Sequence, residues 1–249
     1  MLSIIQVGHD DASDRYIRNK IKAIDAAGMV AEVVNLPKES STEDVLDCIQ
    51  KVSEKDGCTA IMVQLPLPLH IDKDLVLRSV PVEKDIDGLN PHSDYQPLTP
   101  CAIMRWLEKY KLQGRNIVIL GKSDLVGKPL ANMLMDAGAT VTVLNSKTSE
   151  WFREIHCQLA GIVISAVGLP NTFKKSYVSN TFVQTVIDVG INKNEEGKLC
   201  GDVSQGAREL IEENHGICTP VPGGVGKWTV NELVLRLKEM ENRRIHNEN

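Results

Sequence analysis

The sequence predicts an α/β protein built from two domains, each with parallel β-strands. Short apolar runs of strand length alternate with amphipathic helical segments along nearly the whole chain, which is typical of parallel βαβ units. Residues 81–101 interrupt this alternation with four prolines and a polar loop, and mark a domain boundary. We therefore expect one domain of residues 1–100 plus 230–249, and a second domain of residues 101–229.

The predicted strands are apolar segments bounded by turn residues. They lie at 2–7, 31–36, 59–65, 116–120, 140–144, 162–166 and 186–189. The predicted helix at 13–27 stops at Gly28, and the one at 41–52 begins with a capping-box pattern. A second capping-box pattern at 229–232 opens a terminal helix at 229–241, which we expect to return to the first domain.

Composition indicates a soluble protein of the reducing cytoplasm. Hydrophobic residues make up 42% and charged residues 24% of the chain, and the longest apolar runs are far shorter than a membrane span. Residues 1–8 lack the features of a signal peptide. The six cysteines form no pair with metal-ligand spacing, so we expect core thiols and no bound metal. A net charge of −5 with scattered basic residues argues against nucleic acid as a partner.

A glycine-containing turn after the strand at 116–120 is a candidate nucleotide site. The turn reads Gly-Lys-Ser-Asp-Leu-Val-Gly at 121–127 and leads into a predicted helix at 128–137. Glycines there let the backbone approach a pyrophosphate, and the helix N-terminus offers N–H groups to the anion. Ser123 stands where the GxGxxG pattern has its middle glycine, so an ordinary βα turn without a ligand is the alternative.

The next predicted strand ends in Asn-Ser-Lys-Thr at 145–148, without the acid that would bind a ribose 2′-hydroxyl. The hydroxyls, together with Lys147 and Lys122, favour NADP over NAD, although NAD is possible. A solvated loop is the alternative interpretation.

Several polar residues before the predicted boundary are candidates for chemistry. Tyr16 and Lys20 are four residues apart and share one helix face. A YxxxK pair also occurs in short-chain dehydrogenases, but there it follows the nucleotide turn, whereas here it precedes it. Gln64 lies at the end of the predicted strand at 59–65, which stops immediately before Pro66, and open α/β sheets bind ligands at the carboxyl ends of their strands. For each candidate a structural role is the alternative.

Two loops complete the set. Lys-Asp-Ile-Asp-Gly at 84–88 places two carboxylates in a tight loop, which could equally be a solvated turn. Pro-Val-Pro-Gly-Gly-Val-Gly at 220–226 combines three glycines with two prolines. Such a loop is rigid, and its N–H groups can line a ligand.

In this order, these blocks resemble the bifunctional methylenetetrahydrofolate dehydrogenase/methenyltetrahydrofolate cyclohydrolase family. The resemblance covers nearly the entire chain and rests on the segments at 7–8, 12–20, 63–68, 84–88, 121–129, 187–192 and 220–226. It implies a folate domain followed by a Rossmann-like NAD(P) domain, with the C-terminal helix returning to the first. It also implies tetrahydrofolate one-carbon derivatives as substrates and a homodimer formed through the Rossmann-like domains.

The resemblance also implies roles for individual residues. Lys20 is implied to be the catalytic lysine and Gln64 its hydrogen-bonded partner, with Tyr16 against the folate. The implied catalytic residues are Lys20, Gln64, Tyr16 and Asp87, and the implied substrate-binding residues are Tyr16, Gln64, Asp87, Pro222, Gly223 and Gly224. The implied cofactor-binding residues are Gly121, Lys122, Ser123, Val126, Gly127, Ser146, Thr148, Gly168 and Ile191.

The chain departs from the family at several places. Family members carry a helix before the strand at 2–7, so the resemblance predicts an N-terminally shortened member. The loop after Gly88 is short, Lys122 replaces a usual arginine, and Asn145 replaces a usual histidine. We expect one face of the first sheet to expose apolar surface unless the terminal helix, a partner chain or disorder compensates. The first domain is accordingly predicted to be the less stable one.

Two other functions remain open at this point. A catalytically weakened relative would bind folate and nucleotide without turnover, but no structural need explains Tyr16, Lys20, Gln64 and Asp87 together. Another Rossmann oxidoreductase would need a catalytic histidine or a Ser-Tyr-Lys set after the nucleotide turn. The histidines after that turn have no such context, and they are His156, His215 and His246.

Overall fold

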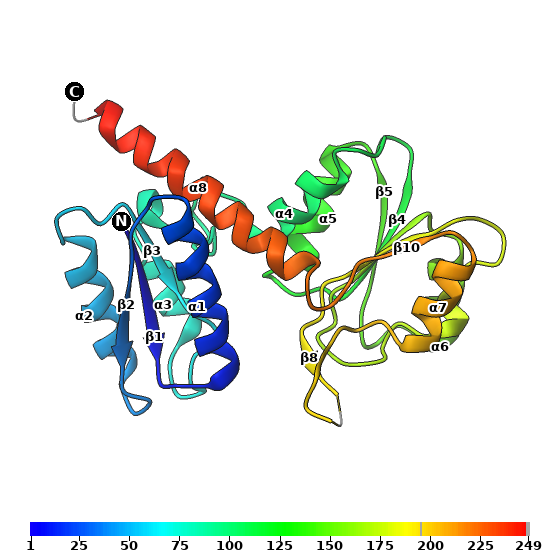
Figure 1. Cartoon of the computed structure of the whole chain (residues 1–249), viewed down its shortest axis with the longest axis horizontal. Coiled ribbons are helices and arrows are strands. Elements are labelled where there is room, and N and C mark those ends of the chain that lie inside the picture. Colours follow the sequence, from blue (N-terminus) through cyan, green and yellow to red (C-terminus); the bar gives the residue numbers. More distant parts are fainter. Residues whose placement is uncertain (195, 248–249) are drawn as a thin grey trace. The chain divides into compact units, whose positions relative to one another are not determined.

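The computed structural model describes residues 1–194 and 196–247 (Figure 1). It divides into two compact units, Met1–Leu98 with Val230–Asn249, and Thr99–Thr229. Each unit contains a parallel β-sheet with helices, which confirms the predicted α/β class. None of the helices in the described part of the chain is long and apolar enough to cross a membrane.

The first unit contains a three-stranded parallel sheet in the order β2-β1-β3. Its elements are β1 (Leu2–Val7), α1 (Asp11–Ala26), β2 (Ala31–Leu36), α2 (Thr42–Ser53), β3 (Ala60–Val63), α3 (Lys73–Ser79) and the 3₁₀ turn η1 (Val82–Lys84). Leu2 pairs with both Ala31 and Ala60, so the strand starts are aligned. The carboxyl ends of the strands consequently lie at one edge of the sheet.

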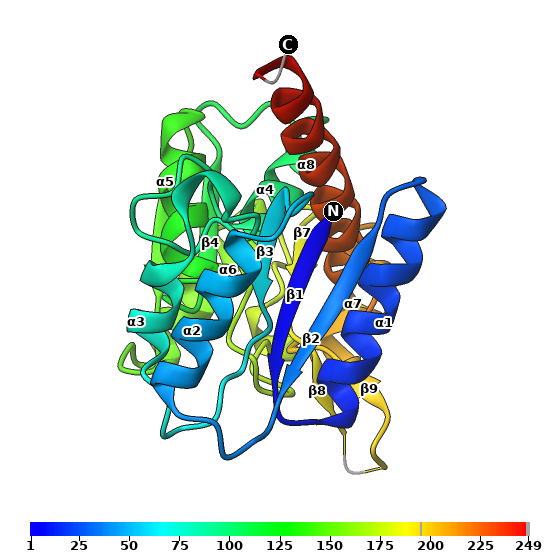
Figure 2. The ribbon, with the colours of Figure 1, turned by 90° about the vertical axis from the view of Figure 1, so that its left-hand side faces the viewer.

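Helices cover both faces of this sheet (Figure 2). On one face α2 and α3 contribute Ile49 and Val76 to a core with Ile5. On the other, Ile24 of α1 and Leu233 of α8 (Val225–Asn247) pack into a core with the strands. The strand residues Leu2 and Ile4 there are fully buried. The terminal helix therefore covers apolar surface of the sheet, one of the compensations considered from the sequence.

One of the two predicted capping boxes is confirmed and the other is wrong. Ser41 caps α2: its side chain accepts from the N–H of Asp44, whose carboxylate accepts from the N–H of Ser41. Helix α8 instead begins at Val225, so Thr229 lies inside it. The Thr229 hydroxyl donates to the Val225 carbonyl at 3.0 Å. A threonine one turn into a helix can satisfy its hydroxyl in this way and then has no capping role.

The second unit contains a five-stranded parallel sheet in the order β10-β7-β6-β4-β5. Its main elements are α4 (Leu98–Leu107), β4 (Asn116–Leu120), α5 (Gly127–Asp136), β5 (Thr140–Leu144), α6 (Glu150–Gln158), β6 (Ile162–Ser165), β7 (Thr185–Asp188), α7 (Gln205–Glu213) and β10 (Ile217–Cys218). Shorter elements are η2 (Lys175–Tyr177) and the antiparallel pair β8 (Asn192–Lys193) and β9 (Leu199–Cys200).

The strand order reverses at β4. The chain places β5 on one side of β4 and then returns past it to place β6 on the other. Open α/β sheets bind ligands in the crevice outside the carboxyl ends of the strands at such a reversal. In this unit the reversal lies between the turn that follows β4 and the loop that follows β6.

Candidate active site

The first unit surrounds a buried lysine with groups from α1 and from the end of β3. Lys20 of α1 is 6% exposed, and its Nζ lies 3.0 Å from Oε1 of Gln64 and 3.0 Å from Sδ of Met62. Both partners are uncharged. Tyr16 lies one helical turn earlier, with its ring centroid 4.6 Å from the Lys20 Nζ. The structure therefore brings Tyr16, Lys20 and Gln64 together.

The position of Gln64 follows from the sheet. Strand β3 ends at Val63, and the N–H of Gln64 still donates to the Ile5 carbonyl of β1 at 2.8 Å. The Gln64 amide also donates to the Leu65 carbonyl at 2.6 Å. With its Nε2 anchored in this way, the Gln64 side chain presents Oε1 to the lysine.

Burial adjusts the ionisation of both Tyr16 and Lys20. Desolvation lowers the pKa of Lys20, and the negative charge of Asp87 partly opposes this. The pKa of Tyr16 is raised to about 12, first by burial and then by Asp87. The site thus holds an amine that gives up its proton more readily than a free lysine, beside a phenol that keeps its own.

The two carboxylates of the 84–88 loop have different tasks. Asp85 is 3% exposed and accepts from the N–H groups of Gly88 at 3.2 Å and Asn90 at 2.8 Å, so it builds the loop. The pKa of Asp87 is raised to about 6, chiefly by burial. The positive charges of Lys20 and Arg236 act to lower this pKa, whereas the negative charge of Asp85 acts to raise it. Gly88 has φ +67°, and a Cβ there would lie 2.5 Å from the Tyr95 carbonyl oxygen. Only glycine closes this loop without strain.

Arg236 is a member of this site that the sequence analysis missed. It lies on α8, is 5% exposed, and donates to the Ile86 carbonyl at 2.9 Å. Its guanidinium lies 4.9 Å from the centroid of the Tyr95 ring, and its charge lowers the pKa of Asp87. One signal was available, because Arg236 is three residues after the core residue Leu233 and shares its helix face.

The glycine turn of the second unit is closely packed. Gly121 has φ +110°, and a Cβ there would lie 2.2 Å from the Ala166 carbonyl oxygen. A Cβ on Gly127 would lie 2.1 Å from the Gly121 carbonyl oxygen. The exposed Ser123 has a defined task, because its Oγ accepts from the N–H groups of Val126 at 3.2 Å and Gly127 at 3.4 Å. These bonds order the turn that leads into α5, whose N-cap residue Val126 makes no side-chain capping bond.

The loop after β5 is held by its own side chains. The Thr148 hydroxyl accepts from the N–H of Asn145 at 3.1 Å, and the Asn145 side chain accepts from the N–H of Lys147 at 2.9 Å. Ser146 and Lys147 are exposed, as is Lys122 on the neighbouring turn. The side chains of Ser146 and Lys147 can therefore face solvent or a ligand, while the loop that carries them keeps a defined shape.

The remaining predicted residues also belong to the second unit. Gly168 follows β6 with φ +76° and open space where a Cβ would stand, and Ile191 follows β7 with 58% exposure. Pro222 and Gly223 are exposed, whereas Gly224 is buried with its Cβ position 2.5 Å from the Pro220 carbonyl oxygen. Gly168 and Ile191 follow the carboxyl ends of β6 and β7, and the 220–226 loop follows the carboxyl end of β10.

Comparison with protein families agrees with this geometry. Residues 1–87 match the model of the tetrahydrofolate dehydrogenase/cyclohydrolase catalytic domain. Residues 97–245 match the model of the NAD(P)-binding domain of the same family. Together these matches cover most of the chain and correspond to consecutive parts of it.

Individual relatives are similar over nearly their full lengths. The bifunctional protein FolD of Lysinibacillus sphaericus is 38% identical over 257 residues, which cover 99% of this chain and 88% of that protein. The crystal structure of FolD, a methylenetetrahydrofolate dehydrogenase/cyclohydrolase from Campylobacter jejuni, has a TM-score of 0.89 and 37% identity, covering 97% of this chain and 88% of that one.

A further solved structure is a complex. It is the Trypanosoma brucei N5,N10-methylenetetrahydrofolate dehydrogenase-cyclohydrolase with NADP cofactor and inhibitor. Its TM-score is 0.89 at 32% identity, covering 98% of this chain and 87% of that one. The family models and these similarities agree along the whole length of the molecule. The chain therefore belongs to the tetrahydrofolate dehydrogenase/cyclohydrolase family.

Proposed function

We propose that this protein oxidises 5,10-methylenetetrahydrofolate to 5,10-methenyltetrahydrofolate with NADP and hydrolyses that product to 10-formyltetrahydrofolate. One observation carries the proposal most directly. The buried Lys20 amine is hydrogen-bonded to uncharged groups and lies near Tyr16 and within the influence of the Asp87 charge. These are the groups that hydrolysis of a cationic one-carbon bridge needs. Residues 1–100 with 230–249 form the folate-binding domain, and residues 101–229 the NAD(P)-binding domain.

Lys20 supplies the proton transfers of the hydrolysis. Water adds to the methenyl carbon, and its oxygen loses a proton to the neutral Lys20 amine as the C–O bond forms. The bond from that carbon to ring nitrogen N5 then breaks as the added hydroxyl becomes the formyl carbonyl and gives its proton to solvent, and N5 takes the proton that Lys20 returns. One proton is released overall, because the substrate is a cation and the product is neutral. A lowered Lys20 pKa favours the free amine that this step needs.

The groups around Lys20 position the folate. Gln64 orients the amine through a neutral hydrogen bond, which does not fix the amine as a cation in the way a carboxylate would. Asp87 accepts two hydrogen bonds from the amide–amidine edge of the pterin. Those bonds favour the ionised carboxylate, which offsets the burial that raises its pKa. Tyr16 lies with its ring against the folate.

The second unit fits a dinucleotide at the reversal of its sheet. When bound, NADP accepts the hydride from the one-carbon bridge. The close packing at Gly121 and Gly127 lets the turn backbone approach the pyrophosphate, as in other dinucleotide folds. Lys122 and Ser146 hold the 2′-phosphate. The other cofactor-binding residues are Ser123, Val126, Thr148, Gly168 and Ile191. Pro222, Gly223 and Gly224 contact the substrate from the loop before α8.

The protein works in the cytoplasm as a homodimer formed through the second unit. Strand β5 is an edge strand without charged residues, and its Val143 is 37% exposed. Trp151 and Phe152, on the helix that follows, are 67% and 43% exposed. An uncharged exposed edge beside large apolar side chains favours pairing with another chain. Trp151→Glu should convert the dimer to a monomer in sedimentation velocity, whereas a wild-type monomer would contradict this part of the proposal.

Spectroscopy tests the reaction itself. Purified protein is mixed with methylenetetrahydrofolate and NADP or NAD while methenyl absorbance is followed, and methenyltetrahydrofolate is supplied alone in a parallel assay. We expect coenzyme-dependent formation of the methenyl compound in the first assay and its accelerated loss in the second. Binding of folate and coenzyme without turnover would indicate a catalytically weakened relative and contradict the proposal.

A further inference from the structure

A buried carboxylate outside the predicted sites controls the loop that follows β6. Asp202 is fully buried and accepts three consecutive backbone N–H groups of that loop. Their distances are 2.7 Å from Val167, 3.1 Å from Gly168 and 3.1 Å from Leu169. Each of these bonds links residues more than thirty positions apart in the chain. The loop is therefore held by one side chain that lies in a different segment.

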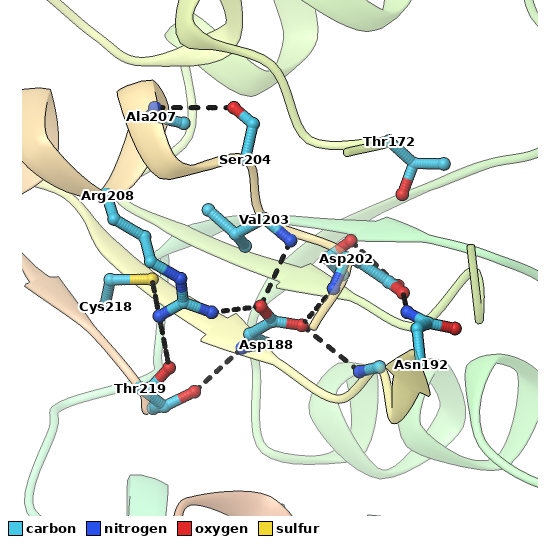
Figure 3. A network of polar contacts seen from close by, with 12 residues as sticks. Thr172, Asp188, Asn192, Asp202, Val203, Ser204, Ala207, Arg208, Cys218 and Thr219 are labelled. Carbon is cyan, nitrogen blue, oxygen red and sulfur yellow. Dashed lines mark hydrogen bonds and ion pairs between the residues drawn. The ribbon is translucent and has the colours of Figure 1, made fainter. Parts of the chain in front are cut away.

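The same carboxylate also holds the segment that follows β7. The Asn192 side-chain amide donates to Asp202 at 3.0 Å (Figure 3). The Ser165 hydroxyl donates to Asp202 at 3.2 Å. A Cβ on Gly190 would lie 2.0 Å from an oxygen of Asp202, so the β7 segment packs directly on the carboxylate. Asp202 thus joins the carboxyl ends of two neighbouring strands, at the edge where open α/β sheets bind ligands.

A second buried acid holds Asp202 in turn. Asp188 accepts from the N–H groups of Asp202 at 2.8 Å and Val203 at 3.1 Å, and it forms an ion pair with Arg208 (Figure 3). Its own N–H donates to the Thr219 hydroxyl at 2.8 Å. Among the described residues, the hydrogen bonds of Asp188 include none to the 167–169 loop. Asp188 therefore stabilises the framework, while Asp202 holds the loop itself.

The segments that Asp202 holds present apolar side chains outward. Val167 is 40% exposed and Leu169 is 59% exposed in the loop after β6, and Ile191 is 58% exposed after β7. The N–H groups of the loop donate inward to the buried carboxylate, so the loop presents mainly its aliphatic side chains to the outside. Ligand sites that take flat aromatic groups are mostly lined by apolar side chains of this kind.

We propose that Asp202 is a positioning residue for the coenzyme, holding Val167, Leu169 and Ile191 as an apolar surface for the nicotinamide ring. The inference rests on the proposed function and adds to it a residue and a surface. A carboxylate suits this position because it is purely an acceptor and the groups hydrogen-bonded to it are all donors. Asparagine has nearly the same shape, but its amide hydrogens would face the N–H groups of the loop.

The test compares Asp202→Asn with wild type and with Asp188→Asn. For Asp202→Asn we expect the calorimetric Kd for NADP to rise about tenfold or more, from the loss of charge-assisted hydrogen bonds. The KM for NADP should rise by a similar factor, with a smaller change in kcat. Amide exchange at residues 167–169 should become faster. Asp188→Asn should lower Tm at least as much, because it loses the Arg208 pair, yet it should weaken NADP binding less.

Each contrary outcome is distinct. If the rise in Kd followed the fall in Tm across both variants, Asp202 would have only a structural role. Unchanged NADP affinity and unchanged exchange in Asp202→Asn would overturn the inference and leave the proposed function standing. A wild-type protein that bound neither NADP nor NAD would overturn both. Leu169→Ser provides a second measurement without a buried substitution, and it should weaken NADP binding while leaving Tm nearly unchanged.

Discussion

In the first unit the candidate site consists of side chains, whereas in the second it consists largely of backbone shaped by glycine. In the first, Lys20 is hydrogen-bonded to Gln64, and the ionisation of Lys20 and Asp87 is set by burial and by the charge of each on the other. In the second, Gly121 and Gly127 bring the main chain so close to its neighbours that no side chain fits.

This difference follows from the two tasks. Proton transfer needs a group that can change its charge, and burial among uncharged partners is what lowers the pKa of Lys20. Dinucleotide binding needs N–H groups and close approach, which the backbone supplies without titrating. Substitutions in the first unit should therefore affect proton transfer and folate binding, and those in the second should affect coenzyme affinity.

The largest effect is expected for Lys20→Met, which removes the titrating amine. Cyclohydrolase activity should fall by about 10²–10⁴-fold, the usual contribution of general acid–base catalysis. Some hydride transfer should remain, and folding should be nearly normal. Lys22→Met, an exposed lysine on the same helix, is the matched control. Cyclohydrolase activity within a few-fold of wild type would remove Lys20 from the mechanism.

The pH dependence of cyclohydrolase activity in the wild-type protein is a second test of the role of Lys20. Because burial lowers the pKa of Lys20, the free amine should form at a lower pH than in an exposed lysine. Cyclohydrolase activity should accordingly rise with pH and reach its plateau below the normal titration range of lysine. A profile that rose only with the titration of free lysine would contradict the pKa assignment.

The next largest effect is expected for Asp87→Ala, which should weaken folate binding by roughly 2–4 kcal/mol because pterin donors lose their acceptors. NADP affinity should be unchanged, which equilibrium titration of each ligand measures. Asp87→Asn is the conservative companion, since it keeps the shape and one acceptor. If NADP binding fell and folate binding did not, Asp87 would belong to the coenzyme site instead.

A smaller effect is expected in the choice of coenzyme. Wild type should have a higher kcat/KM with NADP than with NAD, and Lys122→Ala should reduce that ratio by roughly tenfold, as for one lost charged hydrogen bond. Lysine offers a point charge, not a bidentate fork, so the preference should be weaker than an arginine would provide. Equal kcat/KM values for both coenzymes, in wild type and in the variant, would refute the assignment.

The smallest effect concerns local stability without any substitution. The first unit has a three-stranded sheet whose edge strand β2 is half-buried, whereas β4 of the second unit lies inside a five-stranded sheet. We expect amides of the first unit to exchange sooner in hydrogen-exchange measurements. Slower exchange across residues 2–36 than across residues 116–144 would contradict this prediction. It would show that the helices covering the first sheet make that unit at least as stable as the second.

The pattern of residues along the chain was enough to determine the fold class, most strands and the family. Apolar runs predicted β1, β2, β4 and β5 with the bounds that the structure shows. This works because strands and their turns are encoded by neighbouring residues. The capping box of α2 was readable for the same reason, since its two partners are three positions apart.

The rest was decided by contacts between residues far apart in the sequence. Such contacts decide the different environments of Asp85 and Asp87 and the place of Arg236 beside the 84–88 loop. They also decide that Asp202 binds the loop after β6. Helical periodicity can place a charged residue on the buried face, but its partner does not follow from periodicity, because packing of the elements chooses that partner. At Thr229 the local sequence pattern gave the wrong answer. Helix α8 begins one turn before it, so its hydroxyl donates to the Val225 carbonyl and does not cap the helix. Local patterns therefore determine the elements, whereas packing determines which polar groups meet.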